Sequence, residues 1–245
     1  MTYRDVRRLP GAAAPARPAG PAAGRPFTGP AARRSWAWTR TGKPLFDAVL
    51  ASLSLVILCP LLVAVAVLIR LTTPGPALIR QTRVGRGRRP FVLYKFRSMY
   101  TGNSDEQHRL YVRKLLTEDE PPAGGRRGLF KLEDDPRVTP VGRLLRKTSI
   151  DELPQLLNVI RGDMSLVGPR PVLPWEVEMI GEAHGRRFEV RPGITGLWQV
   201  SGRSRLTMRQ GLELDVEYAS RQSFAFDLMI LLKTVPTVLS ARGAR

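Results

Sequence analysis

Two adjacent carboxylates, Asp151 and Glu152, have the residue types and the setting for chemistry on a phosphate ester. They precede an apolar run, Leu156 to Ile160, that is typical of a helix. The cations Arg146 and Lys147 lie only a few residues before them. An ionised carboxylate among cations can attack phosphorus, because the cations relieve its repulsion from an anionic phosphate. The pair is therefore a candidate nucleophilic site.

The same residues also allow a purely structural interpretation. Ser149 and Glu152 have the spacing of a capping box, in which Glu152 would only satisfy backbone N–H groups. Pro154 weakens that interpretation, because a helix capped by Ser149 would lose a backbone hydrogen bond at its fifth position. We expect the helix to begin at Asp151 or later, which places both carboxylates at the positive end of its dipole. Catalysis and capping both stay open on these residues alone.

Two further blocks carry weaker signals. Pro169 and Pro171 restrict the backbone around Arg170, whose guanidinium suits bidentate contact with phosphate. A rigid surface turn with a solvated arginine explains this block equally well. The stretch from Arg191 to Arg203 contains three glycines, which permit tight turns and close approach of the backbone to a ligand.

Several common classes of site are excluded by the 245-residue sequence. It contains no Cys/His set for zinc, no P-loop and no G-x-S-x-G motif. Cys59 is its single cysteine, so a disulfide within the chain is impossible and a reducing compartment fits.

The segment from Leu45 to Leu71 is apolar and long enough to span a bilayer. Pro60, near its middle, predicts a bend because it removes one helical hydrogen bond. Residues 1–43 and 72–100 flank the segment and supply +15 of the net charge of +18. Since Lys/Arg-rich flanks stay in the cytoplasm, we expect both ends on one side, in a re-entrant helix hairpin.

The position of the basic blocks also bears on partners. Basic residues beside an apolar segment are typical of contacts with anionic lipid headgroups, so membrane lipid is the expected partner. A nucleic-acid-binding protein would more often carry its cations on a folded face with stacking aromatics between them. We therefore expect no nucleic acid partner.

Patterns in the remaining sequence predict short elements after the membrane segment. Two strands are expected at about 77–83 and 90–98, with Gly85 and Gly87 in the turn between them. A helix is expected over 207–220. Residues 223–240 are apolar but carry two charges, which favours an interfacial amphipathic helix, although a buried core helix stays open.

The predicted fold class is α+β and mostly helical, with a re-entrant membrane helix hairpin, a short β-hairpin and a cytoplasmic globular domain with interfacial helices. The predicted organisation is a disordered basic Ala/Pro-rich tail over 1–42, the re-entrant helix over 43–72 and a catalytic domain over 73–240. Eight acids and a PPAGG stretch indicate a flexible insertion over 101–135.

Four motifs between Lys43 and Ser240 resemble those of the monotopic phosphoglycosyl transferases, a bacterial sugar transferase family. KPLFDAVLASLSLVILCP is similar to the family's re-entrant membrane helix. KFRSM, DPRVTPVGRLLRKTSIDELPQLLNVIRGDMSLVGPRPV and RPGITGLWQVSGR are similar to its soluble signatures. Cys59-Pro60 departs from the family's Ser-Pro at the membrane break, and a thiol is a weaker donor than a hydroxyl.

The resemblance implies a reaction and a role for each matching position. Asp151 would attack a UDP-sugar, form an aspartyl-phosphosugar and expel UMP, and the phosphosugar would then pass to a polyprenyl phosphate. Glu152 would complete the dyad, holding Mg²⁺ with Asp151 or managing the acceptor's proton. The resemblance also implies a group of residues that would contact the donor or the carrier phosphate, or support the site: Arg146, Pro169, Arg170, Pro171, Arg203 and Asp215.

The resemblance implies that the reaction begins the assembly of an exopolysaccharide, a capsule, an O-antigen or a glycoprotein glycan. The expected location is the inner membrane, with the catalytic domain facing the cytoplasm. Whether the chain forms a homo-oligomer stays open. The competing hypothesis is a non-enzymatic basic adaptor at the membrane surface, which would not need the Asp151–Glu152 pair.

Overall fold

The computed structural model describes residues 37–100, 109–110, 135–201 and 206–239. Most of the predicted tail and of the predicted insertion lie outside these ranges, as does Arg203. The predicted boundary at residue 43 falls inside a helical segment, because a π-helical turn, Trp38–Gly42, runs directly into the following helix.

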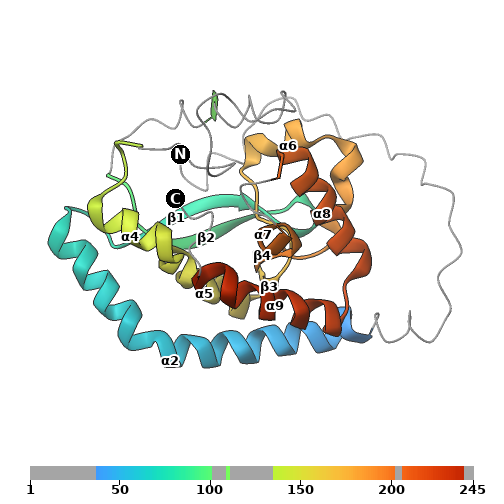
Figure 1. Cartoon of the computed structure of the whole chain (residues 1–245), viewed down its shortest axis with the longest axis horizontal. Helices are drawn as coiled ribbons and strands as arrows, with labels where there is room; N and C mark the ends of the chain where they lie inside the picture. The colour runs from blue at the N-terminus through green and yellow to red at the C-terminus, as the bar shows by residue number, and fades with distance from the viewer. Residues whose placement is uncertain (1–36, 101–108, 111–134, 202–205, 240–245) are drawn as a thin grey trace, which may run out of the picture.

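That following helix, α2, covers Lys43–Thr72 as one element of 30 residues with Pro60 inside it. It bends midway and runs along one side of the molecule (Figure 1), as the proline predicts. Its buried residues cluster toward the two ends: Lys43, Asp47, Ala51, Val65 and Ile69. Between Ala51 and Val65 no residue is fully buried. Leu55, Leu58 and Leu62 pack against the body there, and the other apolar side chains of this stretch are largely exposed.

The first turns of α2 are fixed to the body by a buried polar cluster. Lys43 Nζ lies 3.0 Å from Asp227 Oδ2 and 3.6 Å from Asp47 Oδ2. Asp47 accepts a hydrogen bond of 2.7 Å from Ser165 Oγ, and Asp227 accepts one of 2.9 Å from Trp38 Nε1. Because each of these buried charged groups has an ion-pair or hydrogen-bond partner, the cluster fixes the start of the helix without leaving a charged group unpaired.

The other end of α2 is held by Arg97, which is 3% exposed. Its Nη2 donates to the carbonyl and to the hydroxyl of Thr73, each at 2.9 Å. The same guanidinium also donates to the carbonyls of Pro74 and Gly75. Both ends of the apolar helix are therefore bonded to the same body.

An antiparallel hairpin follows, made of β1 (Leu78–Val84) and β2 (Pro90–Phe96). The short turn η3 (Arg86–Arg88) joins them, with a φ of 66° at Gly87, where a glycine is favoured. The predicted strands and their glycine turn are confirmed to within two residues.

The segment with the two candidate carboxylates is helical, as predicted, but it begins in a different helix type. Helix α4 (Pro140–Thr148) ends at Ser149, which has a φ of 58° and makes no side-chain cap for the next element. A 3₁₀ segment, η4 (Ile150–Gln155), comes next, and the α-helix α5 (Leu156–Arg161) begins only after it. The helical segment begins at Ile150, one residue before the predicted start, and both acids lie in its first turn as predicted. Its first six residues are 3₁₀ rather than α-helical, and Asp151 is not its cap. The left-handed Ser149 also forms no capping box.

A short parallel pair, β3 (Ser165–Val167) and β4 (Gly193–Thr195), lies at the centre of the molecule. Around it are α6 (Pro174–Ile180), η5 (Glu182–Glu189), α7 (Leu197–Ser201), α8 (Met208–Arg221) and α9 (Phe224–Leu239). The helices predicted over 207–220 and 223–240 are confirmed as α8 and α9. The mixture of helices with short strands confirms the predicted mostly helical α+β class.

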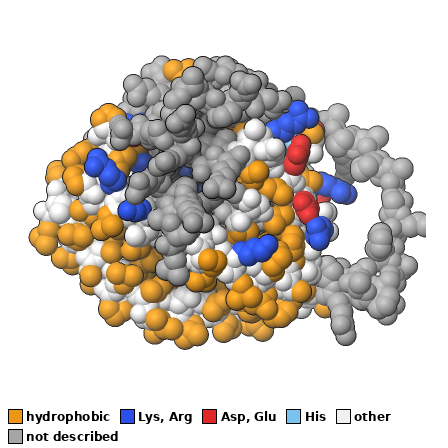
Figure 2. Space-filling model, in the orientation of Figure 1, with side chains coloured by type: hydrophobic (Ala, Val, Ile, Leu, Met, Phe, Trp, Pro, Cys, Tyr) orange, Lys and Arg blue, Asp and Glu red, His pale blue; other side chains and the backbone are white. Residues whose placement is uncertain are grey.

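Helix α9 lies beside the first half of α2 (Figure 1) and has two apolar faces. Ile230 is fully buried in a core that also contains Ala51 of α2. On the outer face the exposed apolar residues are Phe224, Leu228, Leu232 and Val235. Hydrophobic side chains cover the edge of the molecule along which α2 and α9 run (Figure 2).

Candidate active site

The Asp151–Glu152 pair is half-buried in η4, which packs against strand β2. Lys95 lies two residues after the buried Leu93, so both side chains are on the same face of β2. Burial lowers the pKa of Lys95 to about 8, with the charge of Arg83 acting in the same direction, while the negative charges of Asp151 and Glu152 act to raise it. This lysine belongs to the site, and sequence reasoning missed it although it begins the KFRSM motif.

Arg146, in the last turn of α4, is brought to the same place by a close packing contact. Its Nε donates a 2.9 Å hydrogen bond to Ser98 Oγ. A Cβ on Gly142 would lie 2.0 Å from the carbonyl oxygen of Ser98, so only glycine permits this approach. Burial lowers the pKa of Arg146, while the charge of Asp151 raises it, which places the guanidinium within the field of the dyad.

We expect Gly142→Ala to lower stability, by roughly 1–3 kcal/mol, because the added methyl overlaps backbone rather than a movable side chain. Gly185→Ala is a matched control, since a Cβ there meets its nearest atoms at 3.5 Å. Thermal unfolding of both variants checks the prediction. Equal melting temperatures would show that α4 does not depend on this contact.

The loop that carries Arg170 is fixed through its backbone. All four carbonyls from residue 169 to residue 172 accept hydrogen bonds from other elements. The donors are Gly193 N to Pro169 (2.8 Å), Arg187 Nη2 to Arg170 (2.8 Å), Arg83 Nη1 to Pro171 (3.2 Å) and Val84 N to Val172 (2.9 Å). The restricted backbone predicted from the two prolines is present, and it holds the Arg170 side chain in a defined direction.

Asp215 on α8 is fully buried and lies behind this loop. Its Oδ2 accepts hydrogen bonds from Nε (3.2 Å) and Nη2 (2.7 Å) of Arg187, the residue whose Nη2 also bonds the Arg170 carbonyl. Of the two roles open to Asp215, substrate contact or support, this geometry fits support. Arg187 is a second residue that the sequence analysis missed.

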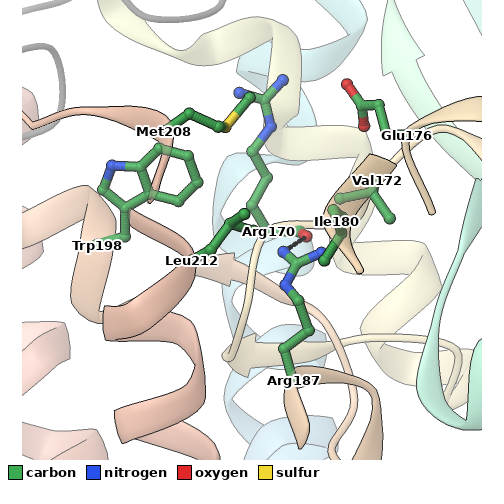
Figure 3. A pocket seen from close by; sticks show the side chains of 8 residues that line it. All are labelled: Arg170, Val172, Glu176, Ile180, Arg187, Trp198, Met208 and Leu212. Atoms are coloured by element: carbon green, nitrogen blue, oxygen red, sulfur yellow. Dashed lines mark hydrogen bonds between the residues drawn. The ribbon is translucent and has the colours of Figure 1, made fainter. Parts of the chain in front are cut away.

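A small pocket flanks Arg170 (Figure 3). Its apolar lining consists of Val172, Ile180, Trp198, Met208 and Leu212. The guanidinium of Arg170 extends past Met208, away from Arg187. Burial lowers the pKa of Arg170, while the nearby charges of Glu176 and Glu152 raise it. Arg170 thus lines the pocket and also lies within the electrostatic field of Glu152.

The structure therefore places three cations from separate elements within the electrostatic field of the two carboxylates: Lys95, Arg146 and Arg170. Such an arrangement can bind a diphosphate and bring a carboxylate oxygen to phosphorus. Pro169 and Pro171 shape the loop, and Arg203 lies outside the described residues.

The same carboxylates can be tested for their fit to a metal. The described ranges contain no group of three or more His, Cys, Asp or Glu side chains placed so that they could hold a metal ion together. Mg²⁺, however, is commonly held by one or two carboxylates together with substrate phosphates and waters. Asp151 and Glu152 are oxygen ligands that fit this mode.

Comparison with known proteins gives consistent matches. Residues 38–241 match the family described as "Bacterial sugar transferase". A UDP-glucose:undecaprenyl-phosphate glucose-1-phosphate transferase of Caulobacter vibrioides is 43% identical over 82% of this chain and 71% of its own length. The exopolysaccharide production protein ExoY of Sinorhizobium fredii is 41% identical over 82% of this chain and 87% of its own length.

Some relatives are much longer than this chain. An undecaprenyl-phosphate galactose phosphotransferase of Salmonella typhimurium is 42% identical over 82% of this chain, but the match spans 41% of that relative. The galactosyl transferase CpsE of Streptococcus agalactiae is 47% identical over 70% of this chain and 36% of its own length.

Proposed function

Because the chain belongs to the bacterial sugar transferase family, we propose that it transfers a sugar 1-phosphate from a UDP-sugar to undecaprenyl phosphate and releases UMP. The relatives named for glucose-1-phosphate and galactose phosphate transfer to this carrier support the substrate classes. The relative named for exopolysaccharide production supports a role at the start of that pathway. The observation that carries the proposal is the Asp151–Glu152 pair among three cations, Lys95, Arg146 and Arg170.

The proposed reaction has two displacements at the phosphorus that bears the sugar. A carboxylate oxygen of Asp151 first forms a bond to this phosphorus, and the bond to the oxygen of the uridine-bearing phosphate breaks, so that UMP leaves. A phosphate oxygen of the carrier then attacks the same phosphorus. The bond to Asp151 breaks, which regenerates the carboxylate and leaves a polyprenyl diphosphate sugar.

The remaining residues bind and neutralise charge. Arg146, Arg170 and Lys95 would contact diphosphate oxygens, where fixed cations stabilise charge better than water does. Glu152 would accept a proton from the carrier phosphate, if that group arrives protonated. Asp151 and Glu152 would also hold Mg²⁺, which supplies further neutralisation of the diphosphate when it is bound.

The way in which α2 is held supports a re-entrant membrane segment, and the basic residues on both sides of it support a location on the cytoplasmic face. Among the described residues, α2 with its preceding turn is the one helical segment that is long and apolar enough to cross a bilayer. Its start is bonded to Asp227 and its end to Arg97, and both belong to the same body. A helix with both ends on one body cannot place them on opposite sides of a bilayer, so we infer that it re-enters. The exposed apolar face of α9 would lie in the lipid interface beside it.

The topology can be tested with single cysteines at two exposed arginines near the ends of α2, Arg40→Cys and Arg80→Cys, each in a Cys59→Ser background. We expect neither to react with an impermeant thiol reagent added to intact cells, and both to react after lysis. External labelling of either position would contradict the re-entrant topology. Efficient labelling of a cysteine in a periplasmic reporter protein controls for access.

The function itself is tested with purified protein in lipid nanodiscs. UDP-glucose and UDP-galactose, the donors suggested by the relatives' names, are incubated with undecaprenyl phosphate and Mg²⁺, and UMP release is measured. The proposal predicts carrier-dependent UMP formation and a sugar diphosphate lipid. A non-enzymatic adaptor would yield neither product, with these donors or with a wider panel of UDP-sugars.

A further inference from the structure

A fully buried amide, that of Asn158 on α5, connects the segment after the dyad to strand β2. Its Nδ2 donates a 2.6 Å hydrogen bond to the carbonyl oxygen of Val92. Its Oδ1 accepts a 3.0 Å hydrogen bond from the backbone N–H of Tyr94. One side chain thus binds a carbonyl and an N–H group on the same edge of the strand.

This pair of bonds has the pattern of a strand–strand contact. A side-chain amide carries one acceptor and one donor face, as a backbone residue does. Asn158 therefore takes the place of one residue of a third strand at the edge of β2 that does not face β1. Because successive strand residues point to opposite faces, binding positions 92 and 94 directs Leu93 and Lys95 to the inner face. A slip by one residue would turn Lys95 outward.

The amide is itself fixed with respect to the dyad. The backbone carbonyl of Asn158 accepts hydrogen bonds from Asp163 N (3.0 Å) and Met164 N (3.2 Å), which close the end of α5. In the other direction η4 and α5 run without interruption from Ile150 to Arg161, so the dyad and Asn158 belong to one short helical segment. Through its bonds to Val92 and Tyr94, Asn158 connects this segment to a defined place along β2.

We propose that Asn158 is a positioning residue that sets Lys95 of β2 opposite the Asp151–Glu152 dyad. This inference rests on the proposed function, in which Lys95 contacts the donor diphosphate. Asn158 touches neither substrate, and its effect on the reaction passes through Lys95.

The test is a double-mutant cycle on nanodisc-embedded protein, with UDP-glucose or UDP-galactose as donor. Asn158→Leu is close in volume and removes both bonds to β2. It should lower kcat/KM by roughly tenfold to a hundredfold, the effect of a small displacement of a reacting group. In a Lys95→Ala background the same substitution should change kcat/KM by less than about twofold, because the residue through which it acts is gone.

A neighbouring core truncation, Val159→Ala, controls for lost stability. Val159 is 3% exposed on the same helix, but its side chain has no hydrogen-bonding group. Its effect should be similar in the wild-type and Lys95→Ala backgrounds. If the losses from Asn158→Leu and Lys95→Ala multiply in the double variant, Asn158 is only structural and the proposal is overturned. Should Asn158→Leu fail to fold, Asn158→Gln keeps the amide but moves it by one methylene and should show the same non-additivity.

A second measurement does not depend on turnover. The rate at which an amine-reactive ester labels Lys95, followed by peptide mass spectrometry, should rise several-fold in Asn158→Leu and stay unchanged in Val159→Ala. Equal labelling in wild type and Asn158→Leu would overturn the positioning role. If Lys95 is labelled faster in Asn158→Leu than in wild type, but the wild-type protein releases no UMP, the positioning role stands and the proposed function is contradicted.

Discussion

Asp151→Asn should abolish turnover while the protein keeps its fold and its association with membranes. An amide has nearly the shape of the carboxylate but cannot act as the nucleophile toward phosphorus. We expect kcat to fall by a factor on the order of 10⁴ or more, as when other covalent catalytic residues are removed. UMP release and thermal unfolding, measured on the same preparation, separate this loss from an effect on stability.

The alternative role for this region, helix capping, predicts a different outcome. Loss of a cap costs about 1 kcal/mol of stability and should leave the chemistry largely intact. Glu178→Gln, at an exposed acid on α6, provides a matched control that should keep full activity. A well-folded Asp151→Asn protein with near-normal turnover would refute the assignment of the nucleophile.

Arg170→Ala should give the second largest loss, with kcat/KM lower by roughly 10²–10³-fold, which is typical for removal of one donor to a developing negative charge. The loop should keep its position, because its carbonyls are bonded by groups from outside it, including Arg83 and Arg187. Arg170→Lys should recover part of the activity, since it keeps the charge but lacks the planar guanidinium.

A nearby arginine provides the comparison for this loss. Arg186 is exposed on η5 and lies 3.9 Å from Glu189, so Arg186→Ala removes a cation of the same type without touching the loop. Steady-state kinetics with varied UDP-sugar should show wild-type values for it. Equal losses in Arg170→Ala and Arg186→Ala would mean that net positive charge, rather than the directed guanidinium, supports the reaction.

The elements that the sequence predicts well are those governed by local rules. The hairpin follows from two short strand-like runs on either side of Gly85 and Gly87. Helix α8 follows Thr207, whose hydroxyl and whose partner Gln210 form a capping box. The bend of α2 follows from Pro60 alone. In each case the physical cause lies within a few residues of its effect.

The start of the segment with the dyad is predicted to within one residue, but its 3₁₀ geometry is not, because two local signals compete there. Ser149 has the type and spacing of an N-cap, but it also ends α4, and the structure uses it in a left-handed conformation for that second purpose. Pro154 is accommodated in a 3₁₀ segment, a possibility that an argument based on α-helix positions does not include.

The sequence also did not predict the contacts between segments that are distant along the chain. Arg187 meets Asp215 across 28 positions, and Lys43 meets Asp227 across 184. Charge pairing over such distances leaves no periodic pattern in one sequence. Lys95 was missed for a related reason, since its importance depends on the packing of η4 over β2 rather than on its neighbours in the chain.

The central claim, a covalent intermediate on Asp151, is tested most directly by trapping it. Wild-type protein is mixed with a UDP-sugar labelled in the sugar, without carrier, and quenched rapidly in acid. The account predicts label on the protein, located at Asp151 by peptide mass spectrometry, lost on treatment with base or hydroxylamine, and absent from Asp151→Asn. If an active preparation never acquires label at any quench time, transfer passes directly from donor to carrier, and Asp151 is a general base or metal ligand instead.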